Sequence, residues 1–232
     1  MARAATRYAG ITGLTGITVF TAAAALVSVP CLSGRCRTAV AEEGPAGMAA
    51  GTTYRFGASE ARTTVLFESE TDLETIHGVT HTMSGTAVLD FERGTGTAEL
   101  TVPVKSLQTG IEARDGHLRS DTWLDEAKFP SIVFKAKKIA KRASGDVWDY
   151  EGTIAIHGVT KDLKGEAAVK RIAEEVGRKL GPGEWVKVKT AFQVTISEFG
   201  IEVPDERVKA KVSPIWDVKV DIFGTTAPPK EK

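Results

Sequence analysis

Apolar and polar residues alternate over most of the chain after Thr53. Apolar side chains recur at every second position in five runs, which are Met83–Phe91, Leu100–Val104, Ile132–Ala136, Val186–Ile196 and Val212–Ile222. A period of two is typical of half-buried antiparallel strands, because successive side chains point to opposite faces of a sheet. The pattern therefore predicts strands that turn one face toward a common core.

Glycine-rich segments separate these runs at Arg93–Gly96, Ser144–Asp146 and Gly181–Gly183. Two other segments, Arg114–Lys128 and Arg171–Leu180, have room for one or two helical turns each. About eight strands at this spacing, with little helical periodicity, predict an all-β sandwich or closed barrel.

A short sequence occurs twice. Ile76–Thr80 reads IHGVT, Ile156–Thr160 repeats it, and a glycine follows each copy five residues later. We expect two equivalent hairpin turns, in which Gly78 and Gly158 supply a backbone angle that other residues disfavour.

The N-terminal segment has the features of a secretory signal peptide. Arg3 and Arg7 precede an apolar stretch, Ile11–Val29, and Ala39–Ala41 places small residues where a signal peptidase cuts. We expect residues 1–41 to be removed and the protein to reach the periplasm or the extracellular space. The apolar stretch is also close to the length that spans a bilayer, so an uncleaved membrane anchor is the alternative.

The two cysteines, Cys31 and Cys36, raise the alternative of a lipoprotein. Pro30 and Arg35 precede them, and neither is the small residue that a lipidated cysteine follows. Residues 42–52 are small, glycine-rich and aperiodic, which indicates a linker before a domain at 53–225 and a tail at 226–232.

The charge balance excludes some classes of partner. The chain has 30 basic and 30 acidic residues, so no overall basic field exists to hold a nucleic-acid backbone. Cleavage after Ala41 would remove four arginines and both cysteines but no acid, leaving a formal charge of −4. Such a domain has no disulfide and depends on its core for stability.

The densest group of chemically active side chains lies at Arg114–Ser120 and continues through Trp123–Asp125 to Phe129. It suggests a hydrolase or isomerase in which His117 acts with Asp115 or Asp121. No Gly-x-Ser-x-Gly elbow surrounds Ser120, however, and nearness in sequence does not make a triad. The alternative is a loop and helix that cover one end of a barrel. Arg–Asp pairs and capping bonds would hold the loop while Trp123, Leu124 and Phe129 seal the core.

The histidines give no convergent metal-ligand pattern. The chain contains His77, His81, His117 and His157, and the first two lie in a predicted turn and strand with no further ligand between them. Neither a phosphate-binding loop nor a dinucleotide fingerprint occurs. We therefore expect no metal and no cofactor.

Several longer strings resemble a known family. Residues 109–136 (TGIEARDGHLRSDTWLDEAKFPSIVFKA) and 152–167 (GTIAIHGVTKDLKGEA) are similar to two signatures of the YceI-like family of exported lipid-binding proteins. Shorter matches are VPVKSLQTGI at 102–111, ISEFGI at 196–201 and VSPIWDVKVDI at 212–222. The resemblance covers about residues 53–225.

The resemblance implies an extended lipocalin-like antiparallel β-barrel of about eight strands with one or two short helices. It also implies an interior that holds a polyisoprenoid or similar amphiphile, export to the cell envelope, and no enzymatic activity. Two features depart from the family. Tyr54–Ser59 lacks the aspartate and histidine of many members, and the segment 171–183 is longer and more basic.

Strand parity selects the residues expected to face such an interior, namely Leu89, Phe91, Val102, Ile132, Phe134, Phe192, Val194, Ile196, Trp216, Val218 and Val220. We expect them to bind a long apolar ligand, such as a polyisoprenoid, an isoprenoid quinone or a related lipid, for transport or storage. The rivals are the exported enzyme and a structural domain with a filled core. Contact with a membrane surface and a homodimer are further expectations.

Overall fold

The computed structural model describes residues 51–58 and 60–228. The predicted signal peptide (1–41), residues 42–50 of the predicted linker and residues 229–232 of the predicted tail lie outside them. No helix in the described part of the chain is long and apolar enough to cross a membrane.

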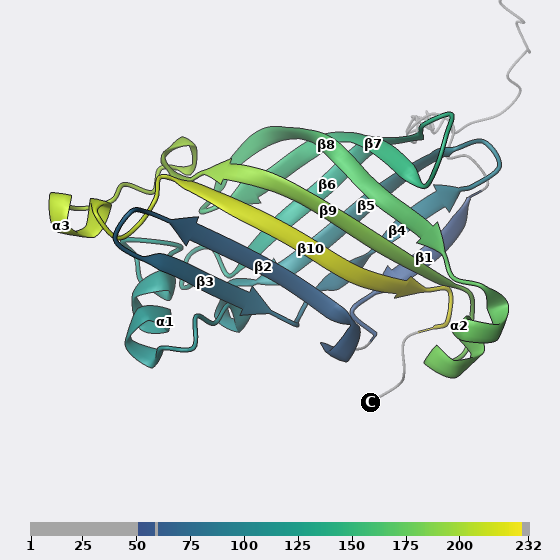
Figure 1. Ribbon diagram of the computed structural model, residues 1–232, viewed down its shortest axis with the longest axis horizontal. Helices are drawn as coiled ribbons and strands as arrows, with labels where there is room; N and C mark the ends of the chain where they lie inside the picture. The colour runs from purple at the N-terminus through teal and green to yellow at the C-terminus, as the bar shows by residue number, and fades with distance from the viewer. Residues whose placement is uncertain (1–50, 59, 229–232) are drawn as a thin grey trace, which may run out of the picture. The chain divides into compact units, whose positions relative to one another are not determined.

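The described residues form ten strands and three short α-helices, with three single 3₁₀ turns between them (Figure 1). The strands are β1 (Thr52–Phe56), β2 (Thr63–Glu70), β3 (Thr75–Thr80), β4 (Ser84–Asp90), β5 (Thr95–Pro103), β6 (Ser131–Lys141), β7 (Val147–Ile156), β8 (Val159–Arg171), β9 (Trp185–Thr195) and β10 (Ile215–Thr225). The helices are α1 (Glu112–Arg119), α2 (Glu174–Leu180) and α3 (Glu206–Lys209). The 3₁₀ turns are η1 (Glu60–Arg62), η2 (Val104–Ser106) and η3 (Ile196–Phe199).

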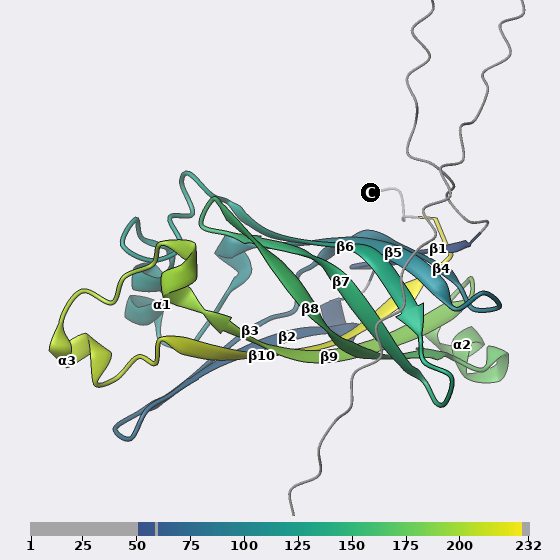
Figure 2. The same ribbon diagram turned by 90° about the horizontal axis from the view of Figure 1, so that it is seen from above.

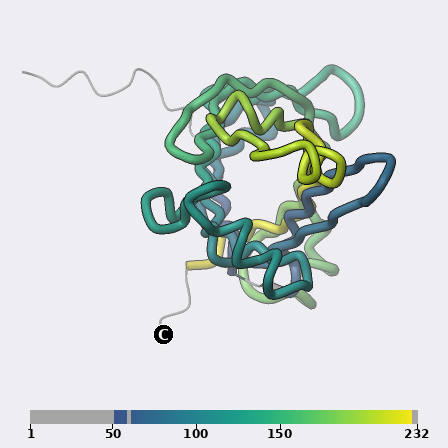
Figure 3. Tube along the Cα trace, turned by 90° about the vertical axis from the view of Figure 1, so that its left-hand side faces the viewer, coloured from purple at the N-terminus to yellow at the C-terminus, as the bar shows by residue number. Residues whose placement is uncertain are grey.

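Eight antiparallel strands close into a barrel, as the sequence predicted. They run in the order β1-β4-β5-β6-β7-β8-β9-β10, and β10 returns to β1 through the pairs Arg55–Thr225 and Phe56–Gly224. Figure 3 shows the ring of strands from the end that carries α1 and α3. Closure leaves these eight strands no free edge along the ring, which removes a template for aggregation.

The hairpin formed by β2 and β3 extends the wall at one end of the barrel. β2 pairs with β10 over Thr63–Glu68, directly beyond the short contact of β10 with β1. β3 pairs with β2, and its far edge is joined to the loop before α1 through Val79 and Gln108. Figures 1 and 2 place this hairpin with α1 and α3, at the end opposite α2.

The bounds of the helices and of the last strand differ in part from those predicted from the sequence. α2 lies inside the second segment predicted to be helical, whereas α1 overlaps the first and begins two residues before it, at Glu112. α3 was not predicted because its single turn is too short to show periodicity; the Asp205 side chain caps it by accepting from the backbone N–H groups of Arg207 and Val208. The last strand begins at Ile215 rather than Val212, since the Val212 N–H bonds back to the Val208 carbonyl.

The IHGVT repeat does not form two equivalent turns, which corrects the sequence prediction. The second copy is the β7–β8 hairpin turn, where His157 and Gly158 have φ of 50° and 75°. The first copy lies inside β3, where the Phe67 ring covers Gly78. A Cβ on Gly78 would lie 1.9 Å from Phe67 Cζ. Gly78 is therefore required by close packing, whereas Gly158 is required by the turn.

Two glycine substitutions should have opposite effects on stability. Gly78→Ala should lower the free energy of unfolding by about 1–3 kcal/mol, because the buried Phe67 ring has to move. Gly116→Ala, in α1 with open space around its Cβ, should raise it by about 0.5–1 kcal/mol. Urea unfolding of both variants measures the difference, and equal effects would contradict the packing of β3 against Phe67.

A candidate apolar binding cavity

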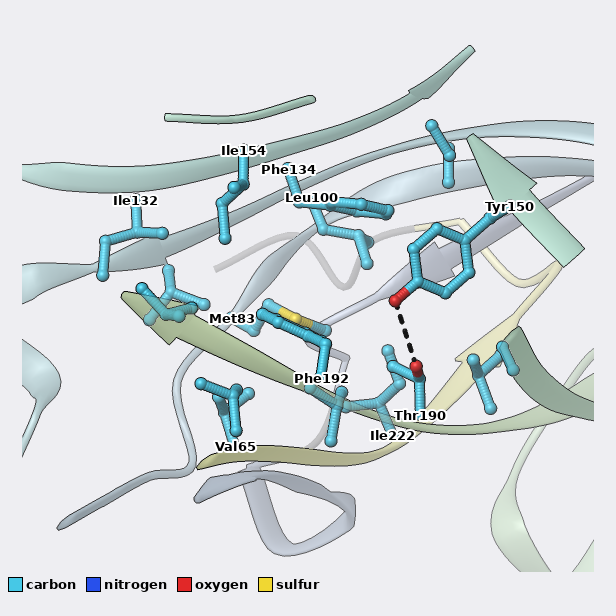
Figure 4. A pocket seen from close by; sticks show the side chains of 18 of the residues that line it. Val65, Met83, Leu100, Ile132, Phe134, Tyr150, Ile154, Thr190, Phe192 and Ile222 are labelled. Atoms are coloured by element: carbon cyan, nitrogen blue, oxygen red, sulfur yellow. Dashed lines mark hydrogen bonds between the residues drawn. The ribbon is translucent and has the colours of Figure 1, made fainter. Parts of the chain in front are cut away.

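The interior of the barrel contains a cavity of about 180 Å³. A single water needs about 10–15 Å³ on the same measure, so the space is far larger than a packing defect. Its lining comes from β1, β2 and β4–β10 together with the segments at the α1 end, and no lining residue is charged. The cavity thus offers a buried apolar surface with few polar atoms (Figure 4).

The structure brings together ten of the eleven residues predicted from strand parity. The cavity is lined by Leu89, Val102, Ile132, Phe134, Phe192, Val194, Ile196, Trp216, Val218 and Val220. Phe91 lies just past the end of β4 and is not among the lining residues. It packs edge-on against Tyr54 and Trp148, with ring centroids 6.2 and 5.3 Å away, and the Arg171 guanidinium lies 4.5 Å from its ring centre. Whether the ten bind a ligand stays a prediction.

A row of small side chains gives the cavity its width. Ala87 on β4 is paired with Ala98 on β5, and Ala98 is paired with Ala136 on β6. All three line the cavity, and Ala136 is paired in turn with Gly152 on β7. Strand parity alone does not single out these residues, because alanine on an alternating strand also fits a filled core. Only the strand register shows that these residues lie side by side at the same height in the barrel.

The α2 end of the barrel is closed by aromatic and charged side chains. Tyr54 and Trp148 are fully buried there, and the Tyr54 hydroxyl donates to Glu184 Oε2 at 3.3 Å. The Arg62 guanidinium lies over the Trp185 ring at 5.5 Å. Arg171, in the basic segment 171–183 that also contains α2, contributes to this closure because its guanidinium lies over the Phe91 ring.

The α1 end carries a row of stacked aromatic rings. Trp216 stacks on Phe67 with centroids 5.2 Å apart and on Trp123 at 6.3 Å. Leu118 of α1 and Leu124 of the following loop are buried beside them. This arrangement agrees with the interpretation of the 114–129 segment as a cover over one end of the barrel.

The residues of the enzyme hypothesis do not form a catalytic arrangement. Asp115 is buried, and its Oδ1 accepts from the backbone N–H and the hydroxyl of Thr109, both at 2.6 Å. His117 is exposed, and no hydrogen bond joins its imidazole to Asp115 or Asp121 among the contacts of the described residues. Ser120 donates to the His117 backbone carbonyl. The carboxylate of Asp115 therefore fixes the start of α1.

The loop is held by charged groups, although the partners differ from the predicted Arg–Asp pairs. Arg114 forms an ion pair with Glu74 at the tip of the β2–β3 hairpin. Arg119 donates to the backbone carbonyls of Asp115 and Lys105. Asp125, at φ 45°, accepts from Lys128 Nζ at 2.8 Å, and this hydrogen bond lowers the pKa of the Asp125 carboxyl.

No group of three or more histidine, cysteine, aspartate or glutamate side chains in residues 51–58 and 60–228 is placed to hold a metal ion. His81 and His157 contact the backbone carbonyls of Thr63 and Phe199, and His77 lies 3.1 Å from Glu68. These contacts give three of the four histidines structural partners.

Burial raises the pKa of the Tyr54 and Tyr150 hydroxyls above the ordinary value of 10.0. These are the two tyrosines of the chain that would begin at Glu42. Because both phenols are neutral in the folded state, their contribution to stability is complete below pH 10 and is lost as the pH rises through their raised pKa values.

An alkaline titration of that chain should therefore show phenolate absorbance only above the ordinary pKa, together with loss of the β-sheet circular dichroism. Phenolate formation at the ordinary pKa in a protein that stays folded would show that the two hydroxyls are open to solvent.

The chain matches a known family over most of its described residues. Residues 56–223 match the model of the YceI-like domain. A UPF0312 protein of Shewanella denitrificans is 32% identical over 112 residues, 47% of this chain and 54% of that protein. A UPF0312 protein of Pectobacterium atrosepticum is 26% identical over 179 residues, 76% and 86% of the two chains. Protein YceI of Escherichia coli is 30% identical over 115 residues, 50% and 53% of the two chains. The match thus spans about half the length of two of these relatives.

Solved structures share the fold. BcnA of Burkholderia cenocepacia superimposes with a TM-score of 0.63 at 17% identity, covering 72% of this chain and 99% of that one. A polyisoprenoid binding domain from Saccharophagus degradans has a TM-score of 0.56 at 16% identity, with 77% and 99% covered. Both likenesses establish the lipocalin-like barrel, and the family match over residues 56–223 shows that the chain belongs to the YceI-like domain family.

Proposed function

We propose that this protein binds a long apolar chain of the polyisoprenoid class inside its barrel, as a carrier or store and without catalysing a reaction. The observation that carries the proposal is the cavity of about 180 Å³ inside the barrel, which has no charged lining residue. The polyisoprenoid binding domain from Saccharophagus degradans, which has the same fold, supports this choice of ligand class.

Burial of the ligand is sufficient to drive binding. Each methylene that leaves water contributes about 0.8 kcal/mol, so a chain of several isoprene units can bind tightly without a charged contact. This accounts for the absence of a conspicuous polar motif among the lining residues. The rival enzyme is not favoured, because Asp115 is occupied by Thr109 and His117 lies exposed outside the cavity.

We further propose that the protein acts in the cell envelope. The support is in the sequence, where a basic start, an apolar stretch and Ala39–Ala41 precede the domain. Fractionation should place the mature chain outside the cytoplasm with Glu42 at or near its N-terminus. A membrane-bound chain that begins upstream of Cys31 would instead favour the anchor. Membrane-surface contact and a homodimer stay predictions.

Binding to protein freed of lipid tests the proposed function. Addition of a polyisoprenoid alcohol should change the fluorescence of the half-buried Trp216, which lines the cavity, and the change should saturate. Saturable binding supports the proposal. No binding of any isoprenoid probe by folded protein would contradict it.

His117→Ala should leave ligand binding unchanged, because the exposed imidazole does not line the cavity. Arg119→Ala should lower the free energy of unfolding by about 1–3 kcal/mol, through the loss of two charged hydrogen bonds to backbone carbonyls. Isoprenoid titration and urea unfolding check the two variants. Loss of all function in a His117 variant with unchanged stability would revive the enzyme hypothesis.

A further inference from the structure

Two hydroxyl groups meet within the otherwise apolar wall of the cavity (Figure 4). Tyr150 on β7 reaches across β8 to Thr190 on β9, and the two oxygens lie 3.3 Å apart. Gly165 on β8 leaves room for this crossing, since a Cβ there would lie 2.5 Å from the Tyr150 hydroxyl oxygen. Tyr150 also packs edge-on against Phe134, with centroids 5.5 Å apart. The Tyr150 hydroxyl is therefore held at a fixed place in the lining.

The hydrogen-bonding capacity of this pair is only partly used. Thr190 Oγ1 donates its single hydrogen to the Glu166 carbonyl at 2.8 Å, so it can only accept from Tyr150. At 3.3 Å that bond is longer than the usual O–H···O distance of about 2.7–2.8 Å. No group among the described residues donates a hydrogen bond to the Tyr150 oxygen. The phenol oxygen thus has a weak acceptor and a free lone pair in the wall of an apolar cavity.

A second buried donor lies on the same strand. Trp148, two residues before Tyr150 and on the same face of β7, also lines the cavity. Its Nε1 is buried, and no acceptor lies within hydrogen-bond distance of it among the described residues. Buried polar groups without a partner are uncommon in native proteins. The Tyr150 hydroxyl and the Trp148 indole N–H therefore give this part of the wall unused hydrogen-bonding capacity.

We infer that the ligand of this cavity carries an uncharged oxygen, a hydroxyl or a carbonyl, which lies against the Tyr150 hydroxyl. The inference rests on the proposed function and specifies the chemistry of the ligand at the same site. A charged head group does not fit there, because no charged side chain lines the cavity and a buried ion would have no partner. A few polar groups in an apolar pocket commonly fix the orientation of a ligand.

Tyr150→Phe removes the hydroxyl and keeps the ring, and Thr153→Val is the matched control, since Thr153 lies on β7 with the opposite parity and does not line the cavity. Both variants and the wild type, freed of lipid, are titrated with three probes. These are geranylgeraniol, the corresponding aldehyde, and the hydrocarbon of the same chain without oxygen. Circular dichroism and urea unfolding confirm that each variant is folded.

Tyr150→Phe should lower the affinity for an oxygenated probe about 3- to 10-fold and leave the affinity for the hydrocarbon unchanged. Thr153→Val should change none of the three. If Tyr150→Phe loses affinity for the alcohol alone, the ligand carries a hydroxyl, and if it loses affinity for the aldehyde alone, the ligand carries a carbonyl. Either result supports the inference. If folded Tyr150→Phe binds all three probes as the wild type does, the inference is wrong while the proposed function stands. If the wild type binds none of them, both fail.

Discussion

Val194→Glu should remove most of the bound lipid and destabilise the barrel. Val194 is 7% exposed, lines the cavity and is paired with Trp216 on β10. A glutamate there buries a carboxyl group among apolar side chains without a partner, at a cost of roughly 2–5 kcal/mol. Lipid content per folded protein should fall roughly tenfold or more, since each 1.4 kcal/mol of lost affinity is tenfold. Mass spectrometry of an organic extract gives the lipid content.

Thr195→Glu is the matched control, because Thr195 is the next residue of β9, has the opposite parity and does not line the cavity. It should keep its lipid and most of its stability. Equal lipid content in the two folded variants would refute the inward assignment of Val194 and place the ligand elsewhere.

Ala98→Phe should expel the ligand without destabilising the protein. Ala98 lines the cavity in the row of small side chains shared with Ala87 and Ala136. A ring at this level occupies space that the ligand would use, so the free energy of unfolding should stay the same or rise by up to about 2 kcal/mol. Displacing two ligand methylenes, at about 0.8 kcal/mol each, already lowers affinity roughly tenfold.

The control is Thr97→Phe, since Thr97 is exposed on the same strand. It should keep the lipid. The combination of lost lipid and retained stability separates a ligand cavity from a core that is merely loosely packed. A folded Ala98→Phe protein with wild-type lipid content would show that the ligand does not pass this level of the barrel.

The strands could be predicted from the sequence because one face of each is buried, which imposes the period of two that is visible in Val186–Ile196. The same logic could not predict that the first IHGVT copy lies in a strand. The two copies have identical letters, and only the packing of Gly78 under Phe67 distinguishes them. α3 escaped prediction because one helical turn has no period to detect.

The candidate site was predictable only in part, for related reasons. Parity places Phe192 and Val194 on the inner face, but it cannot tell that Phe91 lies beyond the end of β4 and packs on Trp148 instead. It likewise treats Tyr150 as one more aromatic residue of a strand. Its role depends on Gly165 and Thr190, which are far from it in sequence and come together only through the register of β7, β8 and β9.

Organic extraction of the mature protein, purified without detergent, followed by quantitative mass spectrometry, tests the central claim most directly. Ala98→Phe purified in parallel is the reference, because it keeps the surface of the barrel and loses the cavity. We expect a stoichiometric amount of one class of neutral isoprenoid lipid in the wild-type extract and little of it in the variant extract. Equal amounts of lipid in the two extracts, or none in the wild type together with no uptake of added isoprenoid, would contradict the account.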